Sequence, residues 1–140
     1  MIWAAIGAFL GLLTIWGVNR LGIGRWNYPI GLICLPFIYV GFALIAARPD
    51  LVWHEIAWGG VFIIFGFIAL ARTNKVILII LGLLWLLHAG FDLLHHNLIE
   101  NPGVPVWYPG LCAGFDVVIG SFILWLASRP SNAESKLRSR

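Results

Sequence analysis

The chain has 140 residues, of which 61% are hydrophobic and only 11% are charged, with a formal net charge of +3. An ordinary soluble domain carries about 25% charged residues, and a soluble domain of this size has too little interior to hide so much apolar surface. The composition therefore excludes a soluble enzyme, a nucleic-acid-binding domain and a disordered chain. It predicts an all-α protein of the cell membrane, built as one polytopic helical bundle.

Five apolar stretches are each long enough to cross a bilayer as a helix, which takes about 20 residues. In chain order we place them at residues 2–23, 28–47, 51–71, 76–98 and 108–128. Backbone groups in hydrocarbon must be hydrogen-bonded within the segment, and the period-2 alternation of a membrane barrel is absent, so these spans are expected to be helices. We expect residues 1–129 to form a single transmembrane bundle and residues 130–140 to form a short basic cytoplasmic tail.

The basic residues predict how the bundle is oriented in the membrane. With five spans, eight of the nine fall on one side, and only Arg48 falls on the other. The eight are Arg20, Arg25, Arg72, Lys75, Arg129, Lys136, Arg138 and Arg140. Because an excess of Lys and Arg marks the cytoplasmic side, we expect the N-terminus outside and the C-terminus inside. The net charge of +3 then reflects orientation and not affinity for nucleic acid.

Glycines in the first and fifth spans are spaced for close packing between helices. Gly7 and Gly11 are four residues apart, as are Gly110 and Gly114, a spacing that lets membrane helices approach closely.

In the second span, Tyr39 is either a ligand-binding residue or a core tyrosine whose hydroxyl is bonded to a backbone carbonyl.

Polar side chains of the third, fourth and fifth spans gather at one depth. Ionisable residues within a membrane cost several kcal/mol each and usually face an interior cavity that has a function. With the predicted orientation, all seven lie in the outer half of the bilayer, and no comparable group lies in the inner half. The seven are His54, Glu55, His88, Asp92, His95, His96 and Asp116.

The fourth span presents several metal-binding groups on one helix face. His88, Asp92, His95 and His96 follow an i, i+4, i+7, i+8 pattern, which at 100° per residue falls within an arc of about 100°. The i, i+3 carboxylate–histidine spacing is that of di-metal helical bundles. Imidazole and carboxylate ligands suit a transition metal better than Ca²⁺ or Mg²⁺.

A short repeat links the fourth and fifth spans. Residues 88–94 read HAGFDLL and residues 112–118 read CAGFDVV. If the two helices packed through Gly90 and Gly114, a local two-fold axis would bring Asp92 and Asp116 together. Cys112 would then match His88, either as a soft metal ligand or as a small buried cysteine.

Charge balance favours a bound cation at this site. Two neighbouring carboxylates in a low dielectric need a cation or a shared proton, and no Lys or Arg lies at this depth. We therefore expect all seven residues to contribute to a site for a divalent transition metal, zinc or iron, with Glu55 and Asp116 also acting as general acid or base. The alternative is a cluster of protonated carboxylates hydrogen-bonded to the histidines.

Three functions are compatible with such a site. The first is a metalloenzyme, a hydrolase or an oxidoreductase, acting on a membrane lipid or another hydrophobic molecule at the outer face. The second is a protein that binds or transports a transition metal or protons. The third is a haem b or quinone redox protein, which would need two histidines facing each other, such as His54 and His88. The segment 102–109 is either a lid over the outer site or a plain connector, and the sequence leaves a homo-oligomer open.

Several motifs carry a resemblance to known families. The run from Trp85 through His96, together with PVWYP at 105–109, FD at 115–116 and IYVGFAL at 38–44, resembles a family of small multi-pass membrane proteins of bacteria and archaea whose function is unknown. This resemblance implies a membrane location. Asp92-x-x-His95-His96 is also similar to one H-x-x-H-H box of the membrane histidine-box oxygenases and desaturases, although its first position is an aspartate and the chain has fewer histidines than that family. The intramembrane zinc hydrolases that use three histidines and an aspartate offer a comparable analogy at the motif level.

Overall fold

The computed structural model describes residues 1–129 and is all-helical over that range. Five helices are each long and apolar enough to span a membrane, which confirms the predicted fold class at this level. They are α1 (Ile2–Leu21), α2 (Gly24–Ile45), α3 (Val52–Ala71), α4 (Lys75–Leu98) and α5 (Tyr108–Ser128), with a 3₁₀ turn, η1 (Pro49–Leu51), leading into α3. The predicted basic tail, residues 130–140, lies outside the described residues.

Local signals in the sequence explain two of the helix boundaries directly. The α1 helix ends at Gly22, whose φ of 68° is readily adopted by glycine and whose N–H donates to the carbonyl of Val18. The α4 helix begins after Asn74, whose side-chain oxygen accepts a hydrogen bond from the N–H of Ile77.

The α2 helix begins at Gly24, four residues before the predicted start at residue 28, so Pro29 lies inside the helix. Proline interrupts a helix mainly because it lacks the N–H that would bond to the carbonyl four residues earlier. Here that carbonyl belongs to Arg25, an exposed residue in the first turn of α2. The missing hydrogen bond therefore falls at the solvent-accessible end of the helix, where it costs little.

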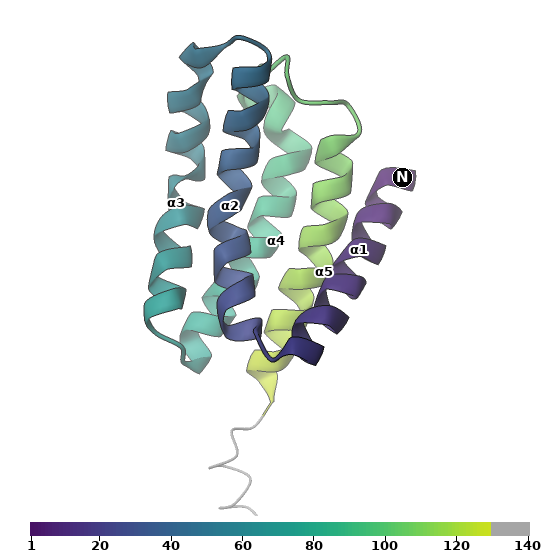
Figure 1. The fold of residues 1–140 in the computed structure, drawn as a ribbon, viewed down its shortest axis with the longest axis vertical. Coiled ribbons are helices and arrows are strands. Elements are labelled where there is room, and N and C mark those ends of the chain that lie inside the picture. Colours follow the sequence, from purple (N-terminus) through teal and green to yellow (C-terminus); the bar gives the residue numbers. More distant parts are fainter. Residues whose placement is uncertain (130–140) are drawn as a thin grey trace, which may run out of the picture.

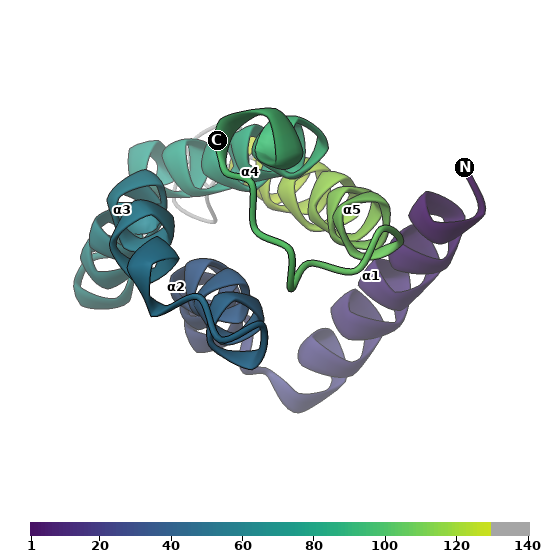
Figure 2. The ribbon, with the colours of Figure 1, turned by 90° about the horizontal axis from the view of Figure 1, so that it is seen from above.

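The helices form two groups that meet along the interior. One group is the hairpin of α2 and α3, and the other is a layer in which α4 packs on α5 and α5 packs on α1 (Figures 1 and 2). The α1 helix lies at the edge of this layer and diverges from α2 beyond the turn that joins them (Figure 1). The connection between α4 and α5 crosses over one end of the bundle (Figure 2), where Gly103 lies directly against the backbone carbonyl of Phe42.

Glycines mark the places where helices approach most closely. A Cβ atom on Gly7 would overlap the backbone carbonyl of Leu111, and one on Gly114 would overlap that of Ala4. The α1 and α5 helices therefore pack backbone to backbone, and glycines of both spans that were noted for their spacing lie at this contact.

The fourth and fifth spans do not pack through Gly90 and Gly114, the arrangement considered for the short repeat. Gly114 faces α1, and Gly90 has nothing within 4 Å of the place where its Cβ would lie. The α4 and α5 helices instead meet at Gly82 and Gly120, where a Cβ on either residue would lie 2.8–3.0 Å from the other's backbone oxygen. The short repeat therefore does not generate a symmetric helix contact.

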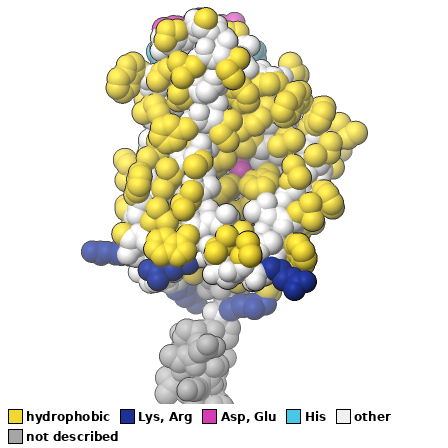
Figure 3. Space-filling view, viewed as in Figure 1, with side chains coloured by type: hydrophobic (Ala, Val, Ile, Leu, Met, Phe, Trp, Pro, Cys, Tyr) yellow, Lys and Arg dark blue, Asp and Glu magenta, His cyan; other side chains and the backbone are white. Residues whose placement is uncertain are grey.

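The outer surface of the bundle is that of a protein surrounded by lipid. Large apolar side chains such as Phe9, Ile64 and Phe67 are well exposed, and Figure 3 shows apolar side chains over most of the visible face. Basic side chains gather at one end of the bundle (Figure 3). The basic residues at the helix ends there are Arg20, Arg25, Arg72, Lys75 and Arg129.

Candidate metal centre

The seven polar residues singled out in the sequence divide into three sets in the structure. His88, Asp92 and Asp116 lie together with Cys112 in a buried cluster. We call these four residues the deep cluster. Glu55 and His95 form a separate buried pair. His54 and His96 are exposed and belong to neither group.

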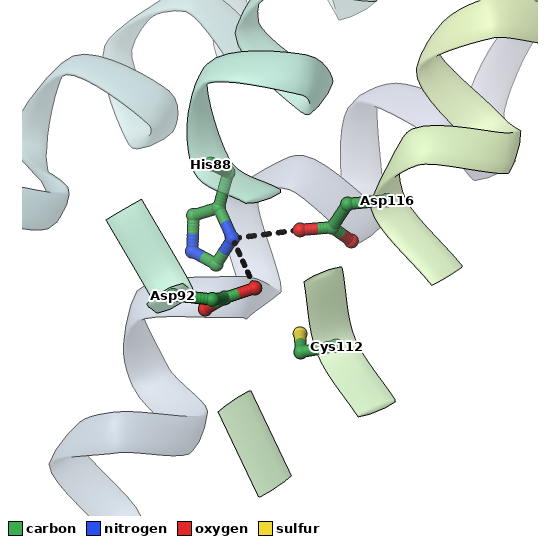
Figure 4. Close-up of side chains that lie close together, drawn as sticks. All are labelled: His88, Asp92, Cys112 and Asp116. Carbon is green, nitrogen blue, oxygen red and sulfur yellow. Dashed lines mark hydrogen bonds and ion pairs between the residues drawn. The ribbon is translucent and has the colours of Figure 1, made fainter. Parts of the chain in front are cut away.

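The deep cluster joins α4 and α5 through short polar contacts. Nδ1 of His88 lies 2.8 Å from Oδ2 of Asp116 and 3.4 Å from Oδ2 of Asp92. Figure 4 shows this edge of the imidazole turned toward both carboxylates, with the sulfur of Cys112 on the side of the carboxylates. One ligand atom from each of the four residues lies within 4.8 Å of all the others. The four side chains come from two adjacent helices, one turn apart on each, as helical periodicity requires.

Burial separates the deep cluster from solvent and leaves it short of hydrogen bonds. Its four residues are between 0% and 5% exposed. Nδ1 of His88 carries at most one proton, so it cannot satisfy both carboxylates. Oδ2 of Asp92, Oδ1 of Asp116 and Nε2 of His88 have no hydrogen-bond partner within residues 1–129. Buried polar atoms are normally paired, so this cluster is suited to a further positively charged or hydrogen-bonding group.

Tyr39 of α2 contacts the deep cluster, whose four residues come from α4 and α5. Its hydroxyl donates a hydrogen bond of 2.7 Å to Oδ1 of Asp92. Of the two roles predicted for Tyr39, a backbone carbonyl partner is therefore wrong, because its partner is a carboxylate. A hydrogen bond from a neighbouring group to a ligating carboxylate is a common feature of metal sites.

The Glu55–His95 pair lies nearer the end of the bundle that carries the connection between α4 and α5. Nε2 of His95 lies 3.0 Å from Oε2 of Glu55, which joins α4 to α3. The amide of Asn101 donates to Oε1 of Glu55 at 2.8 Å and also to the backbone oxygen of Tyr39 at 3.1 Å. The ring of Tyr39 stacks on His95, with centroids 4.0 Å apart. Tyr39 thus contacts both polar groups.

Asn101 was not singled out in the sequence. It stands in the connection after α4, where an asparagine is ordinary turn chemistry, and its Oδ1 does accept a turn hydrogen bond from Gly103 N–H at 3.1 Å. Only the folded chain shows that its amide also closes the Glu55 site. A single sequence carries no signal for that second role.

A pocket of about 410 Å³ opens beside this second pair. His95, His96 and Asn101 supply its polar wall, and the rest is apolar and comes from the connection between α4 and α5 and from the first turn of α5. The apolar residues are Pro102, Val104, Pro105, Val106 and Pro109. The segment 102–109 therefore contributes five residues to the wall of this pocket.

His54 and His96 were predicted as metal ligands, but the structure places both outside the deep cluster. His96 is about 100° around α4 from the buried His95 and points away from the interior. His54 precedes the buried Glu55, is exposed, and has its Nδ1 3.3 Å from the backbone oxygen of Asp50. Because His54 faces outward, it does not face His88, and the histidine pair considered for haem is not formed.

The two aspartates of the repeat do come together, although α4 and α5 do not pack through Gly90 and Gly114. Asp92 and Asp116 both contact Nδ1 of His88, and Cys112 takes a place in the same group. Cys112 Sγ also lies 3.7 Å from the hydroxyl of Tyr108. Two acids, one imidazole and one sulfur provide ligands that suit zinc or iron.

Comparisons with protein-family models, with curated proteins and with solved structures found no match. The interpretation of the site therefore depends on the geometry of its own residues.

Proposed function

We propose that this chain is an integral membrane protein whose deep cluster binds a divalent transition-metal ion. The observation that carries this proposal is the gathering of His88, Asp92, Cys112 and Asp116 within 4.8 Å at nearly complete burial. Four ligands is also the number that a tetrahedral zinc ion takes.

Charge supports a metal over protons alone. No Lys or Arg is among the buried residues of the described chain, so two carboxylates and a thiol have only His88 as an internal cation. One protonated imidazole leaves an excess negative charge when both carboxylates are ionised, and buried charge is costly unless it is paired. A divalent ion compensates both carboxylates and also supplies a partner for the unpaired oxygens. Zinc is our first choice, because it accepts sulfur, imidazole and carboxylate together.

We further propose that the protein is a metalloenzyme acting on a lipid or another hydrophobic molecule. The Glu55–His95 pair lies next to the pocket at the end of α4, and Tyr39 connects this pair to the deep cluster. A carboxylate–imidazole pair beside a largely apolar pocket is suited to general acid–base chemistry on a hydrophobic substrate. In this proposal Asp116 is a metal ligand, whereas Glu55 and His95 move the proton.

The arrangement favours an enzyme over a transporter. Toward the basic end, the interior near the deep cluster contains Leu32, Ile119 and Ile123, which are fully buried and apolar. An ion or proton crossing the bundle needs polar groups along its path. These fully buried apolar residues support a closed centre over a polar path that crosses the bundle.

The metal proposal is tested by elemental analysis of protein purified without chelators and without a polyhistidine tag. We expect a stoichiometric transition metal that is lost in His88→Ala and in Asp116→Asn. His96→Ala is the matched control, because it removes the same side chain from the same helix at an exposed position, and it should keep the metal. Metal-free wild-type protein, or equal loss in the control, would contradict the proposal.

The enzyme proposal needs a separate readout. Purified protein is incubated with lipid vesicles, and the products are detected by mass spectrometry. Glu55→Gln and His95→Ala should abolish product formation while leaving the metal content unchanged, because neither residue belongs to the deep cluster. Full turnover in both variants would exclude this pair from the chemistry.

A further inference from the structure

An apolar groove of about 410 Å³ lies between α3 and α4, and the proposed metal function does not use it. It is bordered by Trp58, Val61 and Phe62 of α3 and by residues of α4 from Leu86 to Leu98. None of its lining residues is charged, and the indole N–H of Trp58 is their only polar side-chain group. It shares no lining residue with the pocket beside the Glu55–His95 pair.

The groove is open to the outside of the bundle. Three of the side chains that line it, Trp58, Leu87 and Leu94, are 49%, 57% and 55% exposed. Both helices are long and apolar enough to span a membrane. In the proposed membrane location, the medium that faces the groove is therefore the hydrocarbon of the bilayer.

Glycine positions explain why this space is left between the two helices. In α3, a Cβ on Gly59 would overlap the side chain of Pro36, so α3 packs closely on α2. In α4, a Cβ on Gly90 would have nothing within 4 Å, and Gly90 lines the groove. Unfilled space forfeits dispersion contacts. Because lipid chains are as apolar as the groove wall, the fit of a molecule to this space supplies the binding energy.

The dimensions of the groove match one hydrocarbon chain. Its lining extends along α4 from Leu86 to Leu98, about 18 Å at 1.5 Å per residue. One leaflet is about 15 Å of hydrocarbon, half of the roughly 30 Å core. Over this length the volume gives a mean cross-section of about 23 Å², whereas an α-helix about 10 Å in diameter occupies about 80 Å². The groove is therefore too narrow for a whole helix.

Two aromatic rings separate the groove from the deep cluster. Phe62 and Phe91 both line the groove, and their ring centroids lie 4.8 Å and 5.7 Å from that of His88. This side of the groove therefore offers no hydrogen-bonding group to a ligand. A molecule held here is recognised by its shape, which suits a hydrocarbon chain and not a polar head group.

We propose that this groove binds one acyl chain of a membrane lipid, extended along α4 from Leu98 toward Leu86. The inference goes beyond the proposed function and does not depend on a bound metal. A helix of a second copy of the chain, with its side chains set into the groove, is the rival occupant.

The test is photo-crosslinking of the full-length protein in phosphatidylcholine vesicles that contain a phosphatidylcholine with a diazirine on one acyl chain. Mass spectrometry then measures the labelling of each residue. Leu87 in the groove is compared with Leu12 of α1, because these leucines are 57% and 58% exposed and lie at similar distances from the same end of the bundle. We expect Leu87 to be labelled about fivefold more, a preference that corresponds to about 1 kcal/mol.

Variants of glycine test whether the groove itself causes this preference. Gly90→Leu fills the groove with a side chain, so labelling of Leu87 should fall to the level of Leu12. Gly90→Ala adds one methyl group and should lower the labelling less. Gly60→Leu is the matched control, because a Cβ on Gly60 also meets nothing within 4 Å but Gly60 does not line the groove. It should leave the preference unchanged, and each variant must keep the helical circular dichroism signal of the wild type.

The proposal is overturned if Leu87 is labelled no more than Leu12 in the wild type, a result that requires no variant to fold. It is also overturned if the preference persists in folded Gly90→Leu. Protection of Leu87 from labelling, together with a disulfide between copies of Leu94→Cys in the Cys34→Ala background, would assign the groove to a second copy. None of these measurements involves the metal, so their failure leaves the metal proposal to its own test.

Discussion

The hydroxyl of Tyr39 donates a 2.7 Å hydrogen bond to Oδ1 of Asp92, across the interface between α2 and α4. The other oxygen of this carboxylate, Oδ2, faces His88. The ring of Tyr39 stacks on His95 with an interplanar angle of 18°. One side chain of α2 therefore fixes the orientation of a proposed metal ligand and also packs on the second polar pair.

Removing the Tyr39 hydroxyl tests this positioning role. Tyr39→Phe keeps the ring stacked on His95 but removes the hydrogen bond to Asp92, so metal affinity should fall by about 10–100-fold, as is usual for partners of metal ligands. Affinity is measured by competition with a chelator of known strength. Tyr28→Phe, which alters a buried tyrosine hydroxyl of the same helix away from the deep cluster, should leave affinity unchanged. Wild-type affinity in Tyr39→Phe would show that this hydrogen bond does not tune the site.

Asn101 is expected to stabilise the end of the bundle. Asn101→Ala leaves Oε1 of Glu55 without its amide donor and releases the connection from the Tyr39 backbone. We expect a loss of about 1–3 kcal/mol of unfolding free energy, together with faster hydrogen exchange in residues 99–107. Asn97→Ala, at an exposed position of α4, should change stability by less than about 0.5 kcal/mol. Equal effects of the two substitutions would argue against this anchoring.

The two glycines of the repeat should respond differently to an added methyl group. In Gly114→Ala the new Cβ meets the carbonyl of Ala4, so α1 must move from α5, at a cost of about 1–3 kcal/mol. In Gly90→Ala the Cβ meets open space, and stability should stay equal or rise by up to about 1 kcal/mol because alanine favours the helix. Thermal unfolding in detergent distinguishes them. A destabilised Gly90→Ala with an intact Gly114→Ala would reverse our assignment of the helix contacts.

The proposed orientation can be tested by thiol labelling in cells. The Cys34→Ala background removes the exposed native thiol and keeps the buried Cys112. Val106→Cys in the α4–α5 connection should react with a membrane-impermeant maleimide on intact cells. Thr73→Cys, in the connection between α3 and α4, should react only after permeabilisation. The opposite pattern would place the N-terminus in the cytoplasm.

The sequence alone determined the number and approximate positions of the helices. Long apolar stretches interrupted by turn residues leave few alternatives in a membrane, because the backbone must hydrogen-bond to itself. The one large boundary difference, at the start of α2, arose because Pro29 falls close enough to the helix end that its missing N–H costs little. Such a distinction depends on which carbonyl is left unpaired and whether it is exposed.

The sequence also determined that polar groups are gathered in the third, fourth and fifth spans, and helical periodicity placed His88 and Asp92 on one face. Only the tertiary structure decided which residues meet. Neighbours in sequence such as His95 and His96 point about 100° apart, and the choice between them depends on how α3 and α4 are rotated. The contacts of Tyr39 and Asn101, and the inclusion of Cys112 in the deep cluster, depend on packing between helices. A sequence does not encode that packing locally, because it results from many weak contacts between segments far apart in the chain.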